Sequence, residues 1–223
     1  MKIQNANFVG IALLTFVFLP LCADAADESY QRAKMGLEEA KASHVIQKYE
    51  GKGVNRAPYN RDGKLGKLEL AKAGVRDPQN NLFLRHGLGD GEGRLDQHEL
   101  AEALRHGLVS VNEKDQIALT EKGLQQSKAW KVIRQYEGKG VNRPPYNRDG
   151  KLGKLELAQA GVRDRHNSLF LRHGLGDGEG FLDRQELAQA LNKGLISISE
   201  EGQIALTEKG LRKSKAWNAE HAG

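Results

Sequence analysis

The sequence predicts a mainly α-helical protein of two tandem repeats with short β-hairpins, in which one helix is shared between the repeats. Residues 44–130 align with residues 131–217 at 66 identical positions out of 87, so a structural unit is duplicated. Apolar side chains recur at helical spacing in each copy. Each copy also contains two acidic, glycine-containing stretches that end where a helical pattern begins. These stretches are expected to be loops between the helices.

The first helix is expected over residues 27–50. Ala42, Val45 and Tyr49 lie three and four residues apart and form an apolar stripe on one helical face. Gly51 follows this stripe and is expected to end the helix.

Local capping signals place the next helices of the first repeat. Asp77 followed by Pro78 is a typical helix start, because the carboxylate caps free N–H groups and proline fits the first helical turn. Asp96 and Glu99 have the spacing of a capping box, which predicts a helix that ends at Gly107.

A hairpin and a long helix are expected to close the first repeat. Residues 108–111 and 116–119 alternate in polarity around a polar turn, which predicts two short strands. Thr120 is then expected to cap a helix over residues 121–137 that runs into the second repeat without a flexible linker.

The N-terminus has the pattern of a cleaved secretory signal. An apolar run over residues 8–21 is too short to span a bilayer, and the small residues at 23–25 predict cleavage after Ala25. A lipid anchor on Cys22 is the alternative, but the bulky Leu21 before it argues against that signal. We therefore expect a secreted or periplasmic protein whose mature chain has no membrane span. The expected divisions are a signal peptide at 1–25, an N-terminal helix with the first repeat at 26–130, the second repeat at 131–217 and a tail at 218–223.

Composition argues against some classes of function. Apolar residues make up 39% and charged residues 28% of the chain, a balance typical of globular proteins. The net charge of +5 is spread along the sequence, so we expect solvated surfaces and no nucleic-acid partner. No Ser/His/Asp set, HExxH motif or separate pair of carboxylates is present, and we expect no enzymatic activity.

The acidic stretches have the chemistry of a site for a hard cation. Residues 88–99 contain four acidic side chains and three glycines. Calcium takes six to eight oxygen ligands at about 2.3–2.6 Å, which a chain can gather locally when alternate residues turn inward around a glycine bend. Residues 58–69 form a related stretch, and both occur again 87 residues later.

These four stretches resemble the loops of the EF-hand calcium-binding family. The resemblance rests on the phasing of glycine, leucine and glutamate, such as Gly63, Leu65 and Glu69 in the first loop. It implies Ca²⁺ as the cofactor and an apolar contact at Leu65 that pairs adjacent loops. The implied ligands, in which residues 64, 94, 151 and 181 use main-chain carbonyls, are Asn60, Asp62, Lys64, Glu69, Asp90, Glu92, Arg94, Asp96, Glu99, Asn147, Asp149, Lys151, Glu156, Asp177, Glu179, Phe181, Asp183 and Glu186.

All four loops depart from the family at their first position. Pro58, Leu88, Pro145 and Leu175 stand where an aspartate is normal, so only a carbonyl is available there. Either the loops bind calcium weakly through that carbonyl or they no longer bind it.

We therefore expect an exported, low-affinity calcium-binding protein that calcium stabilises. This expectation is compatible with a protein partner that the sequence does not identify. A calcium-independent repeat scaffold or adhesive protein is the alternative. A third and more distant alternative is DNA binding, because residues 107–123 resemble the wing hairpin and following helix of winged-helix proteins.

Overall fold

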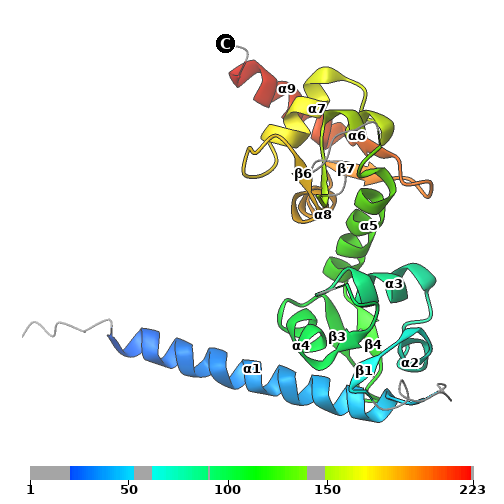
Figure 1. Ribbon diagram of the computed structural model, residues 1–223. Coiled ribbons are helices and arrows are strands. Elements are labelled where there is room, and N and C mark those ends of the chain that lie inside the picture. The colour runs from blue at the N-terminus through cyan, green and yellow to red at the C-terminus, as the bar shows by residue number, and fades with distance from the viewer. Residues whose placement is uncertain (1–20, 53–61, 90, 140–148, 222–223) are drawn as a thin grey trace, which may run out of the picture.

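The computed structural model describes residues 21–52, 62–89, 91–139 and 149–221, with side chains from residue 28 onward. The described residues form nine helices and four two-stranded antiparallel sheets, which are arranged as two similar halves (Figure 1). The predicted mainly helical class with short hairpins is thus confirmed. Residues 1–20 of the signal peptide predicted at 1–25, and the predicted ligands at positions 60, 90 and 147, lie outside the described residues.

The first half contains the predicted helices and hairpin, together with two short strands and a short helix at the acidic stretches, and its first helix begins before the predicted residue 27. Its elements are α1 (Leu21–Tyr49), β1 (Lys64–Leu65), α2 (Lys67–Lys72), α3 (Pro78–His86), β2 (Leu95–Asp96), α4 (Gln97–Arg105), β3 (Val109–Val111), β4 (Ile117–Leu119) and α5 (Glu121–Tyr136).

The second half repeats this order, and α5 serves as its opening helix. Its further elements are β5 (Lys151–Leu152), α6 (Lys154–Gln159), α7 (Arg165–His173), β6 (Leu182–Asp183), α8 (Arg184–Asn192), β7 (Ile196–Ile198), β8 (Ile204–Leu206) and α9 (Glu208–Glu220).

The predicted helix starts are confirmed because their caps are made. The Asp77 carboxylate accepts a hydrogen bond from the Asn80 N–H at 2.7 Å, and the Thr120 hydroxyl accepts one from the Gly123 N–H at 3.1 Å. Such caps satisfy N–H groups that have no partner within the helix. Position 123 must be glycine, since a Cβ there would lie 1.9 Å from the carbonyl oxygen of Leu108.

Each half has its own hydrophobic core, and equivalent helices form it. α1 packs against α4 in the first half as α5 packs against α8 in the second. Leucines at positions 65, 70, 95 and 100 are fully buried in the first core, as are those at 152, 157, 182 and 187 in the second. The duplicated sequence therefore produces two separately packed units.

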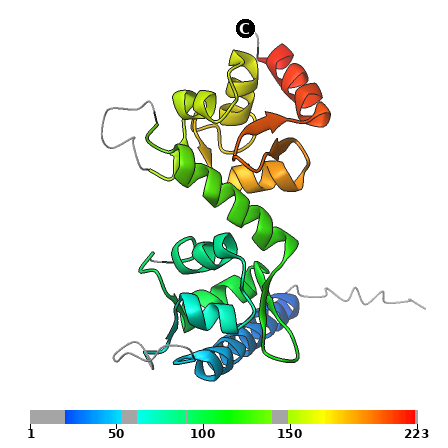
Figure 2. The same cartoon turned by 90° about the vertical axis from the view of Figure 1, so that its right-hand side faces the viewer.

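Helix α5 belongs to both units, as the continuous helical pattern predicts. It contacts α3 in the first half and α8 in the second, and the two halves lie toward its opposite ends (Figure 2). Its Ser127 donates a hydrogen bond to Asn80 at 3.0 Å, while Val132 and Ile133 are buried in the second core. A second link between the halves is the hydrogen bond that Arg184 donates to the carbonyl of Gly87.

Helix α1 runs well past the first core at its N-terminal end, as Figure 1 shows. Tyr30, Met35 and Leu37 are exposed along this part of the helix. None of the helices in the described ranges is both long enough and apolar enough to cross a membrane.

Candidate functional site

The two acidic loops of each half are joined by a short antiparallel ladder. β1 pairs with β2, which places Leu65 opposite Leu95, and β5 pairs with β6, which places Leu152 opposite Leu182. All four leucines are fully buried. The leucine contact that the family resemblance implies is therefore present in both halves. It holds the two loops of a half side by side.

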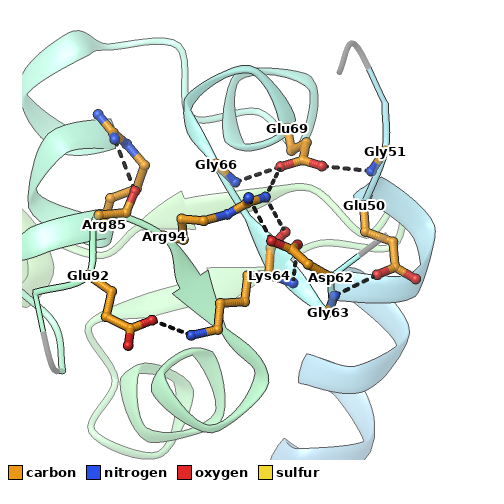
Figure 3. A network of polar contacts seen from close by, with 11 residues as sticks. Glu50, Gly51, Asp62, Gly63, Lys64, Gly66, Glu69, Arg85, Glu92 and Arg94 are labelled. Atoms are coloured by element: carbon orange, nitrogen blue, oxygen red, sulfur yellow. Dashed lines mark hydrogen bonds and ion pairs between the residues drawn. The ribbon is translucent and has the colours of Figure 1, made fainter. Parts of the chain in front are cut away.

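Glu69 is the centre of the first loop. Its side chain is 0% exposed, and it lies in the first turn of helix α2. One carboxylate oxygen accepts a hydrogen bond from the Gly51 N–H at 2.6 Å, and the other accepts one from the Gly66 N–H at 2.6 Å. Glu69 thus connects the end of helix α1 to the start of helix α2 (Figure 3).

The guanidinium of Arg94 lies among the predicted calcium ligands of this loop. One nitrogen is 2.6 Å from the Asp62 carboxylate, and another is 3.3 Å from the Glu69 carboxylate. The same nitrogen donates to the main-chain carbonyl of Lys64 at 3.3 Å. Side chains of Asp62 and Glu69 and the carbonyl of residue 64 therefore converge on one positive charge, as Figure 3 shows.

The sequence resemblance missed this role of Arg94, for which it implied only a carbonyl ligand in the second loop. Arg94 follows the glycine bend of that loop, and its side chain crosses to the first loop beside the β1–β2 ladder. The available signal was the difference between the repeats, because Phe181 stands at the equivalent position.

The first loop of the second half has the same carboxylate arrangement without an arginine. Glu156 is 2% exposed and accepts hydrogen bonds from the Gly138 N–H at 2.6 Å and the Gly153 N–H at 2.7 Å. Asp149 accepts a hydrogen bond from the Lys151 N–H at 3.0 Å. Within the described ranges, neither of these two carboxylates forms an ion pair with a cationic side chain. The ring of Phe181 lies instead over Gly153, 3.4 Å from where a Cβ would stand.

One glutamate of each second loop, Glu92 or Glu179, forms an ion pair with a lysine of the first loop in the same half. The Lys64 Nζ atom lies 2.5 Å from the Glu92 carboxylate, and the Lys151 Nζ atom lies 2.5 Å from the Glu179 carboxylate. The hydrogen bond to Glu179 raises the pKa of Lys151, against the opposing effect of burial. These ion pairs connect the two loops of each half across the ladder, since each lysine belongs to β1 or β5.

The second loops use their remaining acids to start helices α4 and α8. Asp96 and Glu99 form the predicted capping box, in which each side chain accepts from the other residue's N–H at 2.8 and 2.9 Å. Asp183 and Glu186 do the same at 2.8 and 2.9 Å. Each glutamate also lies against the loop backbone, because a Cβ at Gly89 would be 1.9 Å from the Glu99 carboxylate and one at Gly176 would be 1.4 Å from the Glu186 carboxylate.

The donor set of these second loops is compatible with a hard cation. Glu186 accepts a further hydrogen bond from the Asp177 N–H at 3.1 Å. A carboxylate has about four acceptor positions, so these hydrogen bonds use only part of the acceptor capacity of Glu186. Among the described residues, no three histidine, cysteine, aspartate or glutamate side chains already form a metal-binding group. The first loop of the first half does not fit a metal, because Arg94 lies at its centre.

Comparisons of the chain with protein-family models, with curated proteins and with solved structures find no match.

Proposed function

We propose that the chain is an exported protein that binds calcium weakly through its acidic loops, apart from the loop that Arg94 occupies, and is stabilised by the ion. The observation that carries this proposal is the convergence of Asp62, Glu69 and the Lys64 carbonyl on one positive charge. A loop that gathers oxygens around a guanidinium has the fold needed to gather them around a metal ion. The equivalent loop of the second half has the same acidic residues, with Phe181 at the position of Arg94.

The second loops are the main sites under this proposal, since they have more carboxylates than the first loops. Residues 88–99 contribute Asp90, Glu92, Asp96 and Glu99, and residues 175–186 repeat them. More anionic oxygens raise the affinity for a hard cation. The missing first-position aspartate lowers it toward the range of extracellular modules, on the order of 10⁻⁴–10⁻³ M.

Calcium titration by calorimetry, together with thermal melting, tests the proposal. Millimolar calcium should release or absorb heat and raise the melting temperature, because an ion that binds only the folded chain stabilises it. Magnesium should do less, because it requires a smaller and more regular octahedral site. The double variant Glu99→Gln, Glu186→Gln should lose most of the binding heat.

The matched control changes two exposed acids at equivalent positions in the hairpin turns. Glu113→Gln with Glu200→Gln alters the net charge equally but should leave calcium binding unchanged. If neither the wild type nor the control responds to millimolar calcium, the proposal is wrong.

A calcium-independent repeat scaffold is the second candidate function. The observation that favours it is again Arg94, which neutralises one loop without any metal. The exposed Tyr30, Met35 and Leu37 on helix α1 offer contact area for a protein partner. A chain that melts at the same temperature with calcium and with a chelator would support this candidate.

Export is the remaining part of the proposal, and it rests on the N-terminal sequence alone. The expected mature chain begins at Ala26. N-terminal sequencing of material from the periplasm or medium checks it, and a retained Met1 or a lipid on Cys22 would contradict it.

A further inference from the structure

We infer that Arg94 determines which first loop responds to calcium: its guanidinium replaces the ion in the loop of Asp62 and Glu69, and the ion binds instead at Asp149 and Glu156. This inference rests on the proposed calcium-binding function. It adds a specificity-determining residue and divides the duplicated loops into a calcium-independent one and a calcium-dependent one.

The contacts of Arg94 are those expected of a substitute cation. Three of the oxygen groups that the resemblance assigns to calcium, from Asp62, Lys64 and Glu69, lie within 3.3 Å of its nitrogens. The guanidinium is always protonated and its planar fork suits two carboxylates. A calcium ion at the same centre would face this positive charge at close range, so the loop excludes it.

The second half contains the same loop without this charge. Residues 62–69 and 149–156 have the same eight amino acids in the same order. The five residues before the varied position, 89–93 and 176–180, are also identical. The change from Arg94 to Phe181 is therefore the difference in cationic charge at the centre of the two loops.

The buried carboxylate of Glu156 favours the binding of a cation at this loop. Its carboxylate is 2% exposed and is held by two backbone N–H groups, whereas the equivalent Glu69 also has an arginine. A buried charge that lacks a countercharge is costly. Asp149, on the same loop, adds a second carboxylate at the position where Asp62 contacts the guanidinium. A divalent cation would compensate both.

The test exchanges the two residues in the full chain. Arg94→Phe copies the second half into the first and should add one bound calcium per chain, measured by equilibrium dialysis at millimolar calcium. In chelator its melting temperature should fall by roughly 5–10 °C, because a buried ion pair has lost one partner, and calcium should restore it. Phe181→Arg should remove one bound calcium per chain.

Two further variants control for charge and for folding. Arg94→Lys keeps the positive charge and should gain no calcium. Arg94→Gln removes the charge while keeping a polar chain of similar reach, and it should gain calcium even if Arg94→Phe does not fold. Glu156→Gln should lose one bound calcium, while Glu69→Gln should lose none.

The outcomes separate the two proposals. If Arg94→Phe and Arg94→Gln fold and bind as many ions as the wild type, or if Glu156→Gln loses none, the inference is overturned. Calcium binding that persists at the second loops would then leave the proposed function intact. If no variant and no wild-type chain binds calcium, both are wrong.

Discussion

The first acidic loops of the two halves have the same sequence but different centres. In the first half, Glu69 has two backbone N–H donors and the guanidinium of Arg94. In the second half, Glu156 has the two backbone donors at nearly the same distances, and Phe181 replaces the arginine. The backbone donors therefore define the position of the glutamate. The residue that reaches across from the neighbouring loop defines the charge of the site.

The difference between the halves does not extend to their hydrophobic cores. Substitutions of core leucines should have the largest effects on stability, and these effects should be equal in the two halves. Leu95 and Leu182 are fully buried at the β ladders. Replacing either by alanine should lower the free energy of unfolding by about 2–5 kcal/mol through lost burial and a cavity. Urea denaturation of the two single variants measures this. A cost below about 1 kcal/mol for one of them would show that the halves are not packed equivalently.

Substitution of the central glutamates, Glu69 and Glu156, should have a smaller effect on the free energy of unfolding, and this effect should differ between the halves. In chelator, Glu69→Gln should lower the free energy of unfolding by about 1–3 kcal/mol more than Glu156→Gln, since only Glu69 leaves an arginine without one of its partners. Both variants lose a carboxylate oxygen that accepts from a backbone N–H, so this shared loss cancels in the comparison. Equal costs would indicate that the Arg94 contact contributes nothing to stability.

The smallest expected effect concerns an ion pair that only the first half has. Lys48 and Asp115 are 2.6 Å apart, and His44 lies 3.4 Å from the same carboxylate. The equivalent positions in the second half are Gln135 and Gly202, which cannot form the pair.

This pair predicts the sign of a pH dependence. The hydrogen bond from Lys48 lowers the pKa of Asp115, and the same bond raises the pKa of Lys48. The stabilisation from Asp115 is complete above its unfolded pKa of about 3.9 and is lost as the pH falls through the lower folded value. The stabilisation from Lys48 is complete below about pH 10.4 and is lost as the pH rises through the higher folded value.

Melting curves of the wild type and Asp115→Asn across pH check this prediction. The variant should melt slightly below the wild type near neutral pH and converge with it as the pH falls through the lowered folded pKa of Asp115. Glu113→Gln is the matched control, because it removes an exposed carboxylate of the same turn that forms no ion pair among the described residues. Curves that stay parallel over the whole acidic range would contradict the prediction.

The parts of the fold that sequence reasoning predicted depend on nearby residues. The side chains of Asp77 and Thr120 cap their helices by accepting from N–H groups three residues further along the chain. The hairpins follow from alternation within a few residues. The leucine pair across the ladder followed from the phasing of the two loops. In each case the contact joins residues that are close in sequence or that occupy equivalent positions of the two loops.

The charge arrangement of the site could not be predicted in the same way. Arg94 is 25 residues from Glu69, and Lys48 is 67 residues from Asp115. Their partners are determined by how the loops and helices pack, which the sequence pattern does not specify. The exchange of arginine for phenylalanine, in second loops that also differ at positions 97/184 and 98/185, was the visible sign of a different role.

Because both halves pack on α5, the number of helical residues between their contacts determines how one half is rotated relative to the other. The helix has 16 residues, and its Ser127 contacts the first half while Val132 and Ile133 are buried in the second. Each helical residue adds a rotation of about 100° and a rise of about 1.5 Å. One residue inserted between these contacts would turn one acidic loop pair about a quarter of a revolution around the axis relative to the other. The length of a single helix therefore sets the directions in which the two loop pairs face.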